Sequence, residues 1–167
     1  NHAVLIALKT IAQRHRYLDA QITCLTEALT VLVRDANPGL LAAHGVGPDT
    51  AAQLLITAGG NPDRLRSEAS FAALCGTAPV PASSGKITRH RLSRGGDRGA
   101  NNALHHIAVV KMSSHEPARA YVARQRAAGR STPEILRQLK RALAREMFKY
   151  LTRHITTPAT DDLRPTR

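Results

Sequence analysis

A small polar turn followed by a run of positive charge carries the clearest chemical signal in the sequence. Ser83 and Ser84 are adjacent, Gly85 follows them, and the stretch from Lys86 to Arg98 contains one acidic residue, Asp97. The five basic residues of that stretch are Lys86, Arg89, Arg91, Arg94 and Arg98. Lysine and arginine bind phosphate oxygens, and glycine lets the backbone approach a ligand closely. A hydroxyl beside such cations predicts the binding or attack of a phosphodiester, so DNA strand chemistry is the first hypothesis.

A second glycine-bearing turn lies upstream, between two segments that favour short helices. Gly45, Val46 and Gly47 precede Pro48, and proline is preferred at the first position of a helix. The glycines allow backbone angles that side chains forbid, and N–H groups at the start of the second helix could face a phosphate. This order resembles the helix-hairpin-helix element of DNA repair and recombination proteins. The alternative is an ordinary helical hairpin without a ligand.

A long helix is expected to precede both turns. Aliphatic residues alternate at steps of four and three across residues 3–34, which is the a/d pattern of a coiled coil. The stripe consists of Val4, Leu8, Ile11, His15, Leu18, Ile22, Leu25, Leu29 and Leu32, with His15 as its polar member. Asn37-Pro38 is expected to end the helix. The pattern predicts self-association; the alternative is an amphipathic helix that packs on its own domain.

Capping and helix-breaking residues divide the rest of the chain into shorter helices. We expect a coiled-coil segment over 1–37, a compact helical domain over 38–154 and a disordered tail over 155–167. The domain should contain helices at about 67–75, 98–113 and 116–128 and one that starts at Ser131 or Thr132, with helix boundaries at Gly76, Asp97 and Gly129. The fold class predicted is therefore mostly all-α.

The Pro-, Ser- and Gly-rich stretch 76–96 is too long for an ordinary connection in a compact domain. Such a loop is usually functional or disordered, and this one has room for a short hairpin around 86–92. The helix that follows it should bury one stripe, made of Leu104, Ile107, Ala108 and Lys111.

The last helix has an aliphatic face and a basic face. The residues expected to be buried are Leu136, Leu139, Leu143, Met147 and Leu151. Those on the other side are Arg137, Lys140, Arg141, Arg145 and Lys149. These cations are either a solvated helix face or the lining of a nucleic-acid groove.

Charge and composition favour a nucleic-acid partner. The formal net charge is +12 and the isoelectric point is about 11.0, in the range typical of nucleic-acid-binding domains. Aromatic residues make up 3% and Trp is absent, so the core must be aliphatic and suits packed helices. The sequence has no signal peptide and no membrane-length apolar run.

Cysteines and histidines give no metal-ligand pattern. Cys24 and Cys75 are far apart and lack a CxxC partner, so we expect both to be buried free thiols in a reducing, cytoplasmic compartment. The eight histidines lack ligand spacing, and adjacent His105 and His106 point about 100° apart on a helix. No metal site is predicted in this chain.

Four blocks in order, together with the Gly45–Gly47 turn, resemble a transposase family. They are residues 71–86, which end in Pro-Ala-Ser-Ser-Gly-Lys, and residues 94–108, 121–124 and 139–146. The chain resembles the C-terminal half of bacterial insertion-sequence transposases of the DEDD class, which use a bridging guide RNA. The resemblance covers about residues 3–152.

The resemblance implies a division of labour between two domains. A RuvC-like domain with four metal-binding acids and its Mg²⁺ would precede a coiled coil and a transposase domain whose serine attacks DNA and becomes joined to it. That serine directly precedes a glycine, which corresponds to Ser84 and leaves Ser83 as the neighbour. DNA, a guide RNA and further copies of the chain are the implied partners.

The acidic residues of this chain do not make a RuvC-like metal cluster, and the chain begins within a continuing helix without Met. We therefore expect a fragment that binds DNA or RNA weakly and cuts nothing alone. Two other functions remain open: a non-catalytic helix-hairpin-helix DNA-binding module, and a coiled-coil oligomerisation protein with incidental charge.

Overall fold

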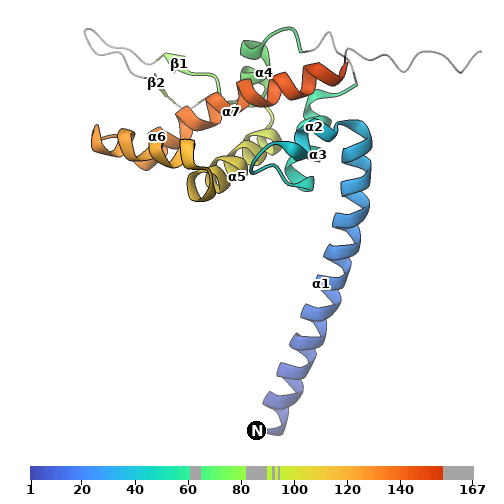
Figure 1. Ribbon diagram of the computed structural model, residues 1–167. Coiled ribbons are helices and arrows are strands. Elements are labelled where there is room, and N and C mark those ends of the chain that lie inside the picture. Colours follow the sequence, from blue (N-terminus) through green and yellow to red (C-terminus); the bar gives the residue numbers. More distant parts are fainter. Residues whose placement is uncertain (61–64, 82–89, 92, 94, 156–167) are drawn as a thin grey trace, which may run out of the picture.

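The computed structural model describes residues 1–60, 65–81, 90–91, 93 and 95–155 and shows an all-α fold, which confirms the predicted class (Figure 1). The helices within these residues are α1 (His2–Ala36), α2 (Pro38–Ala42), α3 (Pro48–Ala58), α4 (Glu68–Leu74), α5 (Arg98–Ser114), α6 (Glu116–Ala127) and α7 (Thr132–Ile155). Two short strands, β1 (Val80–Pro81) and β2 (His90–Arg91), form one antiparallel pair.

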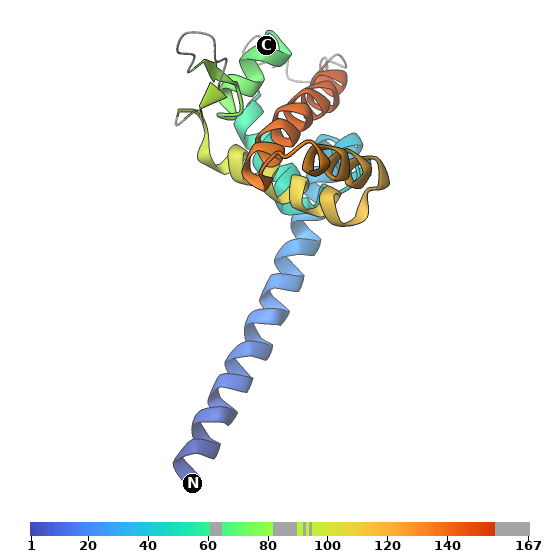
Figure 2. The same cartoon turned by 90° about the vertical axis from the view of Figure 1, so that its left-hand side faces the viewer.

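Helix α1 leaves the other helices and carries the N-terminus away from them (Figures 1 and 2). Its end is attached to the body, because Val33 is buried and Leu29 packs against the core. Towards the N-terminus of α1 the aliphatic stripe is exposed; Ile11 is 66% and Leu25 70% accessible. The long helix is confirmed, and none of the described residues outside α1 covers this part of its apolar side.

The prediction that both cysteines are buried is wrong for one of them. Cys75 is buried at the end of α4, but Cys24 is exposed on α1. A cysteine is buried only where other elements pack around it, and at Cys24 no element of the described chain does so.

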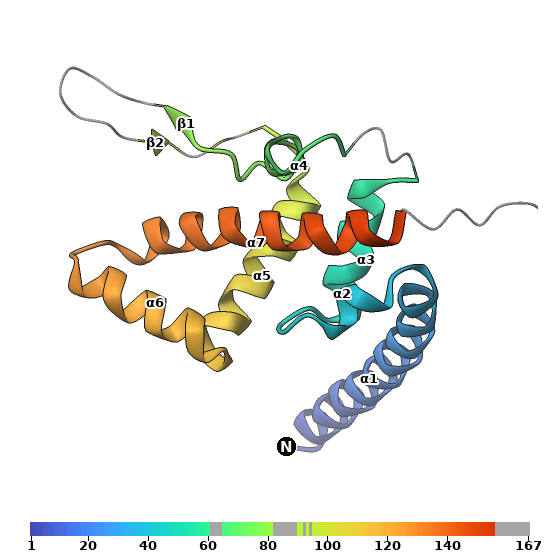
Figure 3. The same ribbon diagram turned by 45° about the horizontal axis from the view of Figure 1, so that its top comes forward.

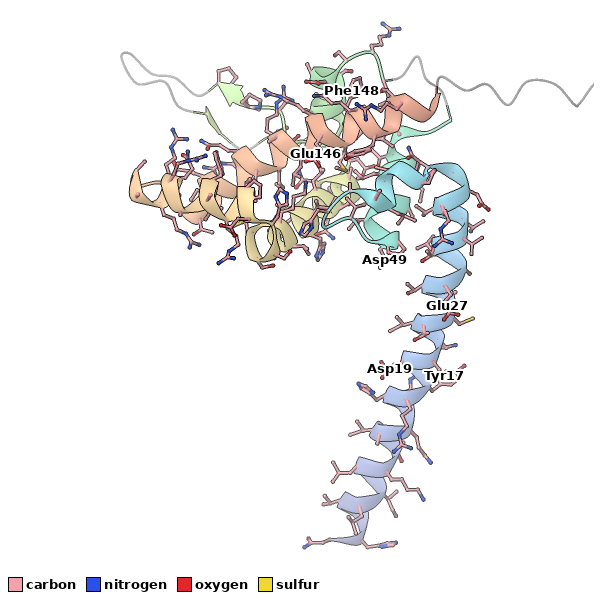
Figure 4. The ribbon with its side chains drawn as sticks, viewed as in Figure 1. Tyr17, Asp19, Glu27, Asp49, Glu146 and Phe148 are labelled. Atoms are coloured by element: carbon pink, nitrogen blue, oxygen red, sulfur yellow. The ribbon has the colours of Figure 1, made fainter. Side chains whose placement is uncertain are left out.

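Helix α5 is the centre of the body, packed between α3 and α7, while α4 lies against α7 (Figure 3). The largest fully buried apolar side chains are Leu40, Leu54, Phe71, Leu104, Ile107, Ile135 and Met147. Phe148 on α7 faces α4, where its ring lies 6.3 Å from that of Phe71 (Figure 4). Each buried Leu, Ile or Phe stabilises the fold by about 1.5–3 kcal/mol.

Asn37 joins the end of α1 to the body. It is 2% exposed, its Oδ1 accepts from the Leu40 N–H at 3.2 Å, and its Nδ2 donates to the Tyr150 carbonyl at 3.0 Å. A buried amide with both ends satisfied fixes the turn between α1 and α2. The predicted helix end at Asn37-Pro38 is therefore confirmed.

The buried face of α7 matches the predicted one in part. Leu143, Met147 and Leu151 are buried, whereas Leu136 and Leu139 are half-buried. Ile135, which is not among the residues predicted to be buried, is fully buried and lies outside the main core. Helix α6 packs along the first half of α7, and the Tyr121 hydroxyl donates to Gln138.

The first strand of the pair lies earlier in the chain than the predicted hairpin around 86–92. Val80 pairs with Arg91 and Pro81 with His90, so the hairpin begins before Ser83 rather than around 86–92. Pro79 and Pro81 supply no N–H to a ladder, so residues 77–81 carry little strand signal of their own.

Candidate nucleic-acid interface

The turn between α2 and α3 is pressed against α5. Gly45 has φ +82, and a Cβ there would lie 3.4 Å from the Ile107 carbonyl oxygen and from Val110 Cγ1. The neighbouring His44 reaches the end of α5, with its Nε2 2.9 Å from the Ser114 hydroxyl. The positive φ therefore favours glycine at position 45, where a Cβ would be in van der Waals contact with α5.

Gly47 lies in open space and begins α3. A Cβ at Gly47 would have no neighbour within 4 Å, which leaves room for a ligand beside the turn. Two N–H groups of the turn are nevertheless already used: Val46 donates to the Ala43 carbonyl at 3.1 Å and Gly47 to the Thr50 hydroxyl at 3.0 Å. A phosphate contact by these groups would require those hydrogen bonds to be exchanged.

An acidic residue lies at the same helix start. Asp49 is exposed in the first turn of α3 (Figure 4), where the helix dipole favours negative charge. It would repel a phosphate at that end. The predicted phosphate contact of Gly45, Val46 and Gly47 thus stays a prediction, and Gly47 is its most accessible member.

The predicted catalytic region is described only in part. Ser83, Ser84, Lys86, Arg89 and Arg94 lie outside the described residues. The backbone of Arg91 pairs with Val80 in the strand pair, and Arg98 is exposed as the first residue of α5. What can be placed is the base of the segment 77–96, which we call the serine loop.

The chain enters and leaves the serine loop at one crossing. Gly76 has φ +63 and Gly96 has φ +92, and a Cβ on Gly96 would lie 2.6 Å from both Gly76 N and the Leu74 carbonyl oxygen. The Asp97 N–H donates to that same Leu74 oxygen at 2.6 Å. Because any side chain would collide with backbone, the crossing requires glycine on both sides.

Asp97 ties the crossing to α3 and α5. Its Oδ1 accepts from the N–H groups of Gly99 at 2.7 Å and Ala100 at 3.2 Å, and its Oδ2 accepts from the Thr57 hydroxyl at 2.6 Å. The predicted role of Asp97 as the N-cap of α5 is confirmed, whereas its hydrogen bond with Thr57 was not predicted. Burial, with the Asp97 charge, raises the pKa of the neighbouring Cys75 thiol to about 12.

Asn101 ties the crossing to α7. Its Nδ2 donates to the carbonyls of Cys75 at 2.8 Å and Gly76 at 3.3 Å, and its Oδ1 accepts from Lys140 Nζ at 2.6 Å. This role of Asn101 could not be predicted, since nothing local marks which residues after α4 and on α7 it will meet. The serine loop therefore starts and ends on a base fixed to three helices.

The buried stripe of α5 includes a charged residue, as predicted. Lys111 is 6% exposed and donates to both Glu146 oxygens, at 2.7 and 2.8 Å. Glu146 points from α7 into the body (Figure 4). Both charges are paired, so this site is structural.

The positive charge is concentrated in the C-terminal helices. Residues 98–153 hold twelve Lys or Arg against three Glu, an excess of nine out of the chain's +12. Basic side chains project from α6 and α7 in Figure 4. A surface of this kind attracts polyanions.

Two further observations apply to the described part of the chain. Within the residues that the structure describes, no group of three or more His, Cys, Asp or Glu could hold a metal ion. None of the described helices combines the length and the apolar character needed to cross a bilayer.

Comparison with known proteins gives two matches. Residues 39–123, from α2 through the serine loop into α6, match the family model described as "Transposase IS116/IS110/IS902 family". The chain is also similar to a Streptomyces coelicolor protein named "Insertion element IS110 uncharacterized 43.6 kDa protein", at 34% identity over 146 residues. That alignment covers 87% of this chain and 35% of the relative, so the chain spans about a third of the relative's length.

Proposed function

Because this chain belongs to the IS116/IS110/IS902 transposase family, we propose that it is the DNA-binding, serine-bearing C-terminal part of an insertion-sequence transposase. The observation that carries this proposal is the match over 39–123, which includes both glycine-bearing turns. The rest of the enzyme would supply a RuvC-like domain and its Mg²⁺. The excess positive charge of α5–α7 supports DNA, and a guide RNA, as partners.

The proposed reaction is transfer of a DNA phosphoryl group to Ser84 and back. In the first step the Ser84 oxygen bonds to phosphorus and loses its proton, while one deoxyribose oxygen leaves phosphorus and gains a proton. In the second step a deoxyribose hydroxyl of another strand bonds to the phosphorus and loses its proton, and the Ser84 oxygen leaves and regains one. Lys86, Arg89, Arg91 and Arg94 would stabilise the charge on the phosphoryl oxygens. Mg²⁺ held by the other domain would stabilise the same negative charge.

The decisive experiment compares two adjacent serines in the full-length transposase with its RNA and Mg²⁺. Ser84→Ala should abolish the covalent protein–DNA adduct on a denaturing gel, while DNA affinity stays within about twofold because phosphate charge dominates binding. Ser83→Ala should retain the adduct. Loss with Ser83→Ala alone would assign the other serine, and an adduct in both variants would exclude the loop from the chemistry.

We also propose that α1 pairs with α1 of another copy through its exposed stripe. Water disfavours so much exposed aliphatic surface, and the 3.5-residue period matches a coiled coil. Leu18→Lys with Leu25→Lys should reduce the mass in analytical ultracentrifugation to that of one chain. The control, Leu5→Lys with Ile6→Lys, changes exposed residues off the stripe and should keep the assembly. An unchanged mass in the first variant would contradict pairing.

A further inference from the structure

Lys140 places a half-buried ammonium group at the base of the serine loop. Its Nζ lies 2.6 Å from Asn101 Oδ1, and Asn101 holds the carbonyls of Cys75 and Gly76, the last residues before the loop. One amide side chain therefore separates this cation from the backbone that enters the loop.

In the described part of the chain, no acidic side chain forms an ion pair with Lys140. The three ion pairs there are His15–Asp19, Lys111–Glu146 and Arg119–Glu116. An ammonium has three N–H donors, and the amide oxygen of Asn101 accepts one of them. Lys111 on α5, by contrast, is buried with a carboxylate bound through both oxygens.

Burial without an opposite charge is unfavourable for the ammonium. Desolvation lowers the pKa of Lys140, because water that would stabilise the charged form is partly excluded. Asp97, the acidic residue at the crossing, already accepts from Gly99, Ala100 and Thr57. An arriving anion would repay the desolvation of Lys140.

Two more cations lie beside this pair. Arg98 is three residues before Asn101 on α5, and Arg137 is three residues before Lys140 on α7; both are exposed. Residues three apart share a helix face, so each arginine lies one turn from the hydrogen-bonded pair. The base of the serine loop is thus a cationic corner that α5 and α7 build together.

We propose that Lys140, oriented by Asn101, binds a non-bridging oxygen of a backbone phosphate in the strand that the serine loop acts on, with Arg98 and Arg137 at adjacent phosphates. The identity of that strand as the cut DNA rests on the proposed function; the phosphate site does not. Because Asn101 holds both Lys140 and the loop entrance, it fixes the position of the bound phosphate relative to the loop.

The first test is binding of fluorescent single-stranded DNA and RNA to this chain over a salt series. Lys140→Met should weaken binding about tenfold and reduce the salt slope by about 1, as expected for one lost phosphate contact. Lys140→Arg should restore most of the affinity. The matched control is Lys149→Met, an exposed lysine nine residues further along α7 and so on the side opposite Lys140, which should change affinity less than threefold.

The pH dependence provides a readout that a purely structural lysine would not affect. Binding needs the charged ammonium, so wild-type affinity should fall as the pH rises into the lowered titration range of Lys140. Lys140→Arg should keep its affinity to higher pH, because a guanidinium stays protonated. Thermal unfolding checks the fold, and Lys140→Gln, which retains a polar chain end, serves as the second neutral variant.

The outcomes separate the two proposals. If Lys140→Met and Lys140→Gln bind like Lys149→Met at all salt and pH values, the phosphate site is wrong. Equal losses with DNA and RNA, or a larger loss with DNA, support it; a loss with RNA alone overturns its assignment to the cut strand. If Ser84→Ala and Ser83→Ala both keep the adduct while Lys140→Met loses affinity, the phosphate site stands and the serine mechanism fails.

Discussion

Two glycines of this molecule, Gly47 at the α2–α3 turn and Gly96 at the base of the serine loop, differ in their tolerance for a side chain. At the α2–α3 turn, Gly47 faces open space, and the fold needs little of it beyond an extended backbone at the helix start. At the base of the serine loop, Gly76 and Gly96 cross with backbone atoms in direct contact. Gly47 thus has room for a side chain, whereas the crossing holds the chain against itself. The same substitution is therefore expected to change stability much less at Gly47 than at Gly96.

The largest effect is expected at the crossing. Gly96→Ala should destabilise the protein by about 3 kcal/mol or more, since positive φ costs about 1–2 kcal/mol and overpacking about 1–3 kcal/mol. Denaturant unfolding measures the change. The control is Gly95→Ala, where a Cβ would meet nothing within 4 Å and the change should be below about 1 kcal/mol. Equal effects at the two positions would contradict the close crossing.

Two threonines give a smaller contrast of the same kind. Thr57→Val should cost about 1.5–3 kcal/mol, because it removes a buried donor to the Asp97 carboxylate. Thr50→Val at the open turn removes a neutral bond to the Gly47 N–H and should cost about 0.5–1 kcal/mol. Both are measured by urea unfolding. A larger loss from Thr50→Val would mean that the α2–α3 turn is the more tightly held of the two.

At Gly47 we expect binding and stability to separate. Gly47→Val should change the free energy of unfolding by less than about 1 kcal/mol, since the site is open and φ is −95. It should weaken DNA binding about equally across sequences, because a backbone contact reads no bases. Filter binding to two unrelated duplexes tests this. Full affinity in a folded variant would leave the turn with a structural role alone.

Thiol chemistry gives the smallest and most local report on the crossing. At pH 8 an alkylating reagent should label Cys24 and spare Cys75, which is buried and has a pKa of about 12. Mass spectrometry should find one adduct in the native protein and two in denaturant. Gly96→Ala should increase labelling of Cys75. Rapid labelling of wild-type Cys75 would show that the crossing opens readily.

The sequence was most informative where a feature depends on a few adjacent residues. Asn37-Pro38, Pro48, Asp97 and Gly129 mark helix boundaries within a residue or two, because caps and breakers act through local backbone chemistry. The central stripe of α5 followed from its period, including the buried Lys111.

Features that join distant segments could not be read in the same way. The bond between Asn101 and Lys140 spans 39 positions, and Ile135 is buried where the first half of α7 packs beside α6. The exposed position of Cys24 depends on the absence of a packing partner in the described chain, which residue type alone does not reveal. The sequence predicts the candidate site as a loop that carries positive charge. The hydrogen bonds that attach the base of this loop to α5 and α7 are visible only in the tertiary structure.

Helix α1 also sets a length scale for any pair of these molecules. Its 35 residues make a rod of roughly 50 Å at about 1.5 Å per residue. Parallel rods would bring both helical bodies to one end. Antiparallel rods would hold them apart by about the length of 15 base pairs, at about 3.4 Å each. Under the proposed pairing and reaction, the orientation of the two α1 helices would decide whether two serine loops reach neighbouring phosphates or phosphates more than one duplex turn apart.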